Sequence, residues 1–181
     1  MKKSLLLLLL LCLLAGFSFT QAQEQNSDDA GFKAGFAAGY LSEIESFGGS
    51  VDLIYQLNDK WSIGNTNMFT VSELPTKERL KWFTMDLNAR YKVYDAFYML
   101  AGGQFLYQTL MEKTYVGGFE SDEQAVQSSN FGANIGAGYI YHLLSNANVF
   151  VELKYTLLAD ESVPVQSSGY MQARIGMVFD L

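Results

Sequence analysis

The sequence predicts an all-β fold, an eight-stranded antiparallel up-and-down transmembrane β-barrel. Three observations predict it. Apolar and polar residues alternate along six of eight segments of residues 31–181, and the links between the eight segments are alternately short and long. The charged residues inside the segments nearly cancel, although the whole chain has a net charge of −7. Period-two alternation is typical of strands whose two faces meet different surroundings.

The N-terminus has the features of an export signal. Two lysines precede an apolar stretch at residues 5–17, and residues 20–22 offer a cleavage site. The stretch is shorter than the roughly 20 residues that span a bilayer as a helix. We therefore expect a cleaved signal peptide at residues 1–22, a periplasmic N-terminal tail at residues 23–30 and the barrel domain at residues 31–181.

Six of the eight segments alternate cleanly between an apolar and a polar face. In residues 82–93, for example, Met85 and Leu87 alternate with Asp86 and Asn88. Such alternation predicts a strand with one apolar side. The six segments are residues 31–41, 50–57, 82–93, 131–142, 149–157 and 170–181.

Two further segments are less regular. Residues 61–71 place Trp61 on an otherwise apolar face that Asn65 and Asn67 share, and residues 97–109 are apolar on both faces. We predict a strand in each, with a β-bulge that shifts the facing partway along. The strand count is then eight.

The links favour a membrane barrel over a soluble sandwich, in which the apolar face would meet a second sheet. Outer-membrane barrels have short periplasmic turns and longer external loops. Short and long links alternate strictly along this chain, and the strand count is even, so we expect both termini on the periplasmic side. The expected short links are residues 58–60, 94–96 and 144–148, and the expected long links are residues 43–49, 72–81, 111–130 and 159–168.

The polar faces carry cations and anions in nearly equal number, as a narrow interior of low dielectric requires. Side chains just fill an eight-stranded barrel, so we expect a polar network without a continuous pore. Inward glycines would make room for the long side chains. The predicted interior network comprises Lys33, Asp52, Asp86, Arg90, Lys92, Glu152, Lys154, Arg174 and Asp180.

With these segments the chain resembles the OmpX-type and OmpA-type family of small outer-membrane β-barrels. The likeness is carried by the eight segments, by residues 149–155 and by the C-terminal strand at residues 170–181. The resemblance implies insertion by the barrel-assembly machinery and contact with outer-membrane lipid and lipopolysaccharide. The last strand departs from the family in ending with Leu181, where an aromatic residue is usual.

His142, Ser145 and Glu152 are the candidate catalytic residues. Residues 142–147 are loosely similar to the His-x-Ser-Asn motif of lipid A deacylases, which are also eight-stranded barrels. A serine nucleophile needs an adjacent base, and the base needs an orienting acid. However, the spacing carries an extra residue, and the run falls at a periplasmic turn, whereas that chemistry works on the outer leaflet. We favour the interpretation of a turn rich in Ser and Asn.

Other kinds of site have weak support in the sequence. Residues 23–181 contain no cysteine and one histidine, so we expect neither a metal site nor a cofactor. No basic patch is large enough for nucleic acid. Interior ionisable groups of membrane proteins are candidates for binding or proton relay, but we favour structural ion pairs. The acidic residues 112–123 could bind a cation or host ligand, and the basic residues 77–81 could contact lipopolysaccharide phosphates.

The sequence therefore favours a non-enzymatic outer-membrane scaffold. Its external loops would contact the envelope, other cells or host molecules, since loops on a rigid scaffold often carry function. Two alternatives remain open: a lipid A-modifying enzyme, and a narrow channel or small-ligand transporter.

Overall fold

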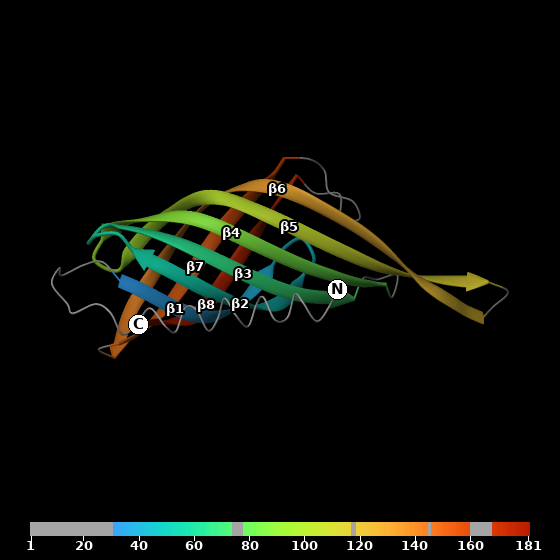
Figure 1. The fold of residues 1–181 in the computed structure, drawn as a ribbon, viewed down its shortest axis with the longest axis horizontal. Coiled ribbons are helices and arrows are strands. Elements are labelled where there is room, and N and C mark those ends of the chain that lie inside the picture. The colour runs from blue at the N-terminus through green and yellow to red at the C-terminus, as the bar shows by residue number, and fades with distance from the viewer. Residues whose placement is uncertain (1–30, 74–77, 117–118, 145, 160–167) are drawn as a thin grey trace.

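The computed structural model describes residues 31–73, 78–116, 119–144, 146–159 and 168–181, without the side chains of residues 112–124. These residues form a closed antiparallel barrel in which the strands pair in chain order and β1 pairs with β8 (Figure 1). The prediction of an eight-stranded barrel is confirmed. The strands are β1 (Gly31–Leu41), β2 (Ser46–Gln56), β3 (Trp61–Glu73), β4 (Arg79–Tyr94), β5 (Phe97–Val116), β6 (Phe119–Leu144), β7 (Ala147–Leu158) and β8 (Gly169–Asp180).

Part of the predicted organisation lies outside the described residues. The signal peptide at residues 1–22 and the tail at residues 23–30 are in that part and stay predictions. The first strand begins at Gly31, where the barrel domain is expected to start. Within the part of the chain that is described, no helix is long and apolar enough to cross a membrane.

The apolar face of the strands points outward, away from the barrel interior. Phe36, Leu87, Ile135 and Leu153, from four different strands, are 55%, 60%, 56% and 50% exposed. In a two-sheet sandwich these side chains would be buried between the sheets. These and the other exposed apolar side chains on the outer face of the strands are here called the apolar belt. Such a belt around a closed barrel is typical of a barrel that sits in a bilayer.

β5 and β6 are longer than the sequence indicates. A loop is expected over residues 111–130, but the two strands stay paired as far as Val116 and Phe119. Outside a membrane both faces of a strand meet water, so the alternation disappears although the backbone ladder continues. Figure 1 shows this hairpin projecting beyond the other strands. Three other strand ends also lie inside expected long links: β2 begins at Ser46, β3 ends at Glu73 and β4 begins at Arg79.

The predicted β-bulges in residues 61–71 and 97–109 are wrong. Residues 61–71 keep a continuous register with β2 and β4, and residues 98–109 keep one with β4 and β6. The register shift between Lys92 and Tyr94 places the extra residue in β4, at the end of the strand and not in residues 97–109. Asn65 and Asn67 therefore stay on the outer face of β3. In β5, the second apolar face belongs to the interior, where residues such as Leu100 and Leu106 are buried.

Leu87→Arg is expected to lower the free energy of unfolding by about 2–4 kcal/mol, because Leu87 lies in the middle of the apolar belt and arginine is that costly near the bilayer midplane. Leu57→Arg, next to the short β2–β3 link, is the matched control, with an expected loss of about 0–1 kcal/mol. Urea titrations in lipid vesicles measure both values. Equal losses at the two depths would contradict an embedded belt.

Candidate functional site

A cavity opens at the end of the barrel that carries Gly31, Leu181 and the short turns. Its volume is about 500 Å³. Its lining includes the exposed residue Lys92 and the buried residues Arg90 and Tyr98. The cavity leads to the polar interior. Short turns lie on the periplasmic side of outer-membrane barrels, so we expect this end to face the periplasm.

Six charged side chains from four strands lie together in the middle of the interior. Each is at most 5% exposed. Three are anionic and three are cationic, so the group, here called the polar belt, is neutral as a whole. Period two places all six on the inward face of their strands. They are Asp52 of β2, Asp86 and Arg90 of β4, Glu152 and Lys154 of β7, and Arg174 of β8.

Glu152 forms ion pairs with both arginines of the polar belt, as Asp52 does. Arg174 donates from Nε to Glu152 Oε1 at 3.1 Å and from Nη1 to Asp52 Oδ1 at 3.0 Å. Arg90 Nη2 lies 3.3 Å from Glu152 Oε2, and the Tyr98 hydroxyl donates to the same oxygen at 2.9 Å. Glu152 therefore ties β7 to β4, β5 and β8 across the barrel interior.

A second group of hydrogen bonds starts at Asp86. Lys154 donates to Asp86 Oδ2, and the Gln104 amide donates to Asp86 Oδ1 at 2.5 Å. The Tyr170 hydroxyl in turn donates to Gln104 Oε1. This chain of contacts connects the polar belt to the apolar residues that surround Tyr170.

Inward glycines leave the space that the long side chains need. A Cβ atom on Gly138 would lie 2.3 Å from the ring of Tyr98, whose hydroxyl donates to Glu152. A Cβ atom on Gly39 would lie 3.0 Å from Cγ of Arg174. Both observations agree with the expectation that glycines on the inward face accommodate large polar side chains.

Three of the nine residues predicted for the interior network lie apart from the belt. Lys33 and Asp180 form their own ion pair at 2.8 Å, with side chains 28% and 41% exposed. Lys92 is exposed at the end of β4 that borders the cavity. Alternation along a strand predicts the face on which a residue lies but not its depth in the barrel. Lys33, Lys92 and Asp180 lie in the lining of the open cavity, where water has access.

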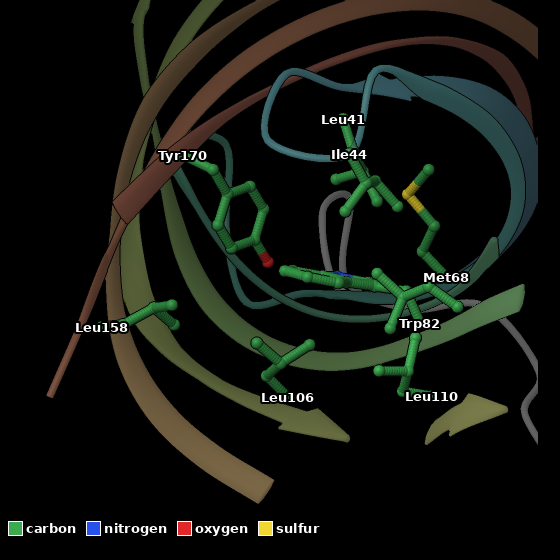
Figure 2. Packing of buried hydrophobic residues seen from close by; sticks show 9 residues of the cluster. Leu41, Ile44, Met68, Trp82, Leu106, Leu110, Leu158 and Tyr170 are labelled. Carbon is green, nitrogen blue, oxygen red and sulfur yellow. The ribbon is translucent and has the colours of Figure 1, made fainter. Parts of the chain in front are cut away.

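Beyond the polar belt, toward the long links, the interior holds a cluster of apolar side chains, which the sequence analysis did not predict. The rings of Trp82 and Tyr170 meet edge to face with centroids 5.4 Å apart. Figure 2 shows the side chains of this apolar cluster gathered inside the barrel. In the sequence, the only indication of an apolar interior at this level is that Trp82 falls on the inward face of its segment. The cluster comprises Leu41, Ile44, Met68, Leu80, Trp82, Leu106, Leu110, Leu158 and Tyr170.

The candidate catalytic residues are not brought together. His142 is exposed, and its Nδ1 is hydrogen-bonded to Asn148 Oδ1. Glu152 is buried and bound by two arginines and a tyrosine, so it does not orient the imidazole. Ser145 lies outside the described residues. In the described part of the chain, no cluster of three His, Cys, Asp or Glu residues could hold a metal ion.

Single-channel recording of the purified protein in a planar bilayer is expected to show no stable, large conductance. The polar belt and the apolar cluster lie one after the other along the barrel, and their side chains are at most 9% exposed. A porin recorded in the same bilayers serves as the positive control. A stable, large conductance would contradict a filled interior.

No family model and no curated protein sequence matches this chain. Solved structures, however, share its architecture. A major outer membrane protein from Thermus thermophilus superposes with a TM-score of 0.71 at 14% sequence identity, and the match covers 84% of this chain and 99% of that chain. This chain has the fold of small outer-membrane β-barrels.

Two further structures agree with this fold. The N-terminal β-barrel domain of Pseudomonas aeruginosa OprF has a TM-score of 0.58 at 16% identity, covering 85% of this chain and 100% of that chain. Ail, the attachment invasion locus protein of Yersinia pestis, has a TM-score of 0.55 at 13% identity, covering 86% and 100%. Together with the apolar outer belt, the shared fold supports a location in a bacterial outer membrane.

Proposed function

We propose that this protein is a non-enzymatic outer-membrane scaffold that presents the β5–β6 hairpin to a partner outside the cell. The projecting hairpin is the observation that carries the proposal. β4 stays paired with β5 only up to Met111, and β7 stays paired with β6 only up to Gly132. β5 and β6 remain paired beyond these points as far as Val116 and Phe119. The filled barrel beneath is a rigid support of the kind on which recognition loops are often held.

The hairpin has a strand edge that another protein can use. Within the described residues, residues 119–129 of β6 have no partner strand on the side where β7 pairs with the rest of β6. The N–H and C=O groups along such an edge can form a ladder with an extended segment of a second protein. This edge supports a partner that adds a strand to β6.

The charge of the hairpin indicates the chemistry of that partner. Residues 112–124 contain four acidic residues and one lysine. Complementary charge speeds and orients association, and like charge opposes it. Ail has been solved in complex with the heparin analogue sucrose octasulfate, but a polyanion would be repelled by the acidic hairpin here. We therefore infer a basic protein segment as the ligand.

Binding of a fluorescent oligolysine peptide to the protein in nanodiscs tests this inference. Neutralising the hairpin by Glu112→Gln, Glu120→Gln, Asp122→Asn and Glu123→Gln is expected to weaken binding at least tenfold at low salt. The matched control is Glu43→Gln with Glu45→Gln in the β1–β2 link at the same end of the barrel, which is expected to leave binding nearly unchanged. Equal weakening by both sets would contradict a specific role for the hairpin.

The proposal includes export through a cleaved signal peptide at residues 1–22, insertion by the barrel-assembly machinery and contact with lipopolysaccharide. Its non-enzymatic part is tested by comparing lipid A masses in cells with and without the gene. We expect identical profiles, because the structure does not place His142 and Glu152 in contact. A change in lipid A mass would favour the lipid-modifying enzyme instead.

A further inference from the structure

The outer face of β3 carries two polar side chains in the middle of the apolar belt. Asn65 and Asn67 lie between Ile63 and Phe69, which are 42% and 52% exposed on the same face. The continuous register of β3 fixes this facing on both sides. The cross-strand neighbours of the two asparagines are all apolar and exposed: Leu53 and Leu87 beside Asn65, and Val51 and Met85 beside Asn67.

Among the described residues, the two amides have N–H donors and an oxygen acceptor without a hydrogen-bond partner, and lipid tails cannot supply one. Asn65 Nδ2 donates to the Asp86 carbonyl oxygen at 3.0 Å, and Asn67 Nδ2 donates to Asn65 Oδ1 at 2.6 Å. A side-chain amide has two N–H donors and an oxygen that accepts twice. Within the described residues, one N–H of each amide and the Oδ1 of Asn67 therefore have no partner. Both side chains are partly exposed on the outer surface.

A donor and an acceptor on one outward patch are self-complementary. The hydrocarbon core offers no hydrogen-bonding groups, so polar atoms there are satisfied by protein. Asparagine side chains hydrogen-bond between neighbouring membrane segments for this reason. Two copies inserted in the same direction can meet at this patch about a two-fold axis along the membrane normal, where each supplies what the other lacks.

We propose that Asn65 and Asn67 form the centre of a contact between two copies of this barrel in the membrane. The Oδ1 of Asn67 accepts a hydrogen bond from an amide N–H of the second copy, and the reciprocal bond forms by symmetry. The surrounding belt residues Val51, Leu53, Met85 and Leu87 pack against their counterparts in the second copy. This self-association is independent of the ligand proposed for the β5–β6 hairpin.

Cysteine crosslinking in native outer membranes tests the contact. Residues 23–181 contain no cysteine, so a single introduced thiol reports on its own position. Met85→Cys, beside Asn67 in the proposed contact, keeps both asparagines and is expected to give at least tenfold more disulfide-linked dimer than Leu153→Cys, which lies on the outer face of β7 across the barrel. Equal crosslinking at the two positions would show random collision and overturn the proposal.

A second test uses a variant in which both amides are replaced by leucine and no thiol is added. Light scattering of the detergent-solubilised protein is expected to show a dimer for the parent and a dissociation constant at least tenfold higher for Asn65→Leu with Asn67→Leu. Retained heat-modifiable migration on a gel would show that the variant still folds. A monomeric parent, or a leucine variant that dimerises as tightly as the parent, would overturn the proposal.

Discussion

Glu152→Gln is expected to lower the free energy of unfolding by about 3–5 kcal/mol, the range for removing one partner of a buried ion pair. The substitution keeps the shape of the side chain but removes the charge that lies against Arg174 and Arg90. Both guanidiniums are buried, so their charges cannot be screened by water. Urea unfolding in lipid vesicles, followed by tryptophan fluorescence, measures the loss.

Lys33→Met is the matched control for this prediction. It breaks the ion pair with Asp180 in the lining of the cavity, where both side chains are partly exposed. Exposed ion pairs contribute about 0–1 kcal/mol, so we expect a loss within that range. If Glu152→Gln cost no more than Lys33→Met, the polar belt would not stabilise the barrel as its geometry indicates.

Trp82→Ala is expected to lower the free energy of unfolding by about 3–5 kcal/mol, as truncation of a large buried aromatic side chain usually does. Trp82 is fully buried, and its ring meets Tyr170 edge to face. The side chains around it belong to a closed barrel, whose walls cannot collapse into the space that the indole leaves. The same urea titration measures the effect.

Trp61→Ala is the control, because Trp61 is the other tryptophan of the chain and lies on the outer face. The centroids of the Trp61 and Tyr91 rings are 4.8 Å apart. An aromatic pair of this kind contributes about 0.5–1.5 kcal/mol to stability beyond the effect of its buried area. We expect a clearly smaller loss than for Trp82→Ala. A larger loss at Trp61 would contradict an interior apolar cluster that stabilises the fold.

The facing of the strands could be predicted from the sequence, because bilayer and interior differ so strongly that alternate residues differ in kind. Met85 and Leu87 point outward and Asp86 points inward, as period two requires. The same reasoning failed where that contrast is absent. At residues 125–129 the side chains on both faces are exposed or partly exposed, so the alternation that would reveal a strand is lost.

The composition of the interior was predictable only in part. Alternation identified inward charges, but the depth of each charge depends on the register between strands. Arg174 and Asp52 lie far apart in the chain and meet only because the barrel closes. Tyr98 belongs to a segment that is apolar on both faces, and its hydrogen bond to Glu152 requires a partner from another strand.

Depth-dependent quenching tests most directly whether the exposed apolar side chains contact hydrocarbon. Leu87→Cys and Ile135→Cys carry a bimane label in vesicles, and Asn58→Cys in the β2–β3 link carries the same label as the control. The account predicts that lipids brominated in their acyl chains quench the labels at positions 87 and 135, whereas aqueous iodide quenches the label at position 58. Quenching by iodide but not by brominated lipid at positions 87 and 135 would contradict it.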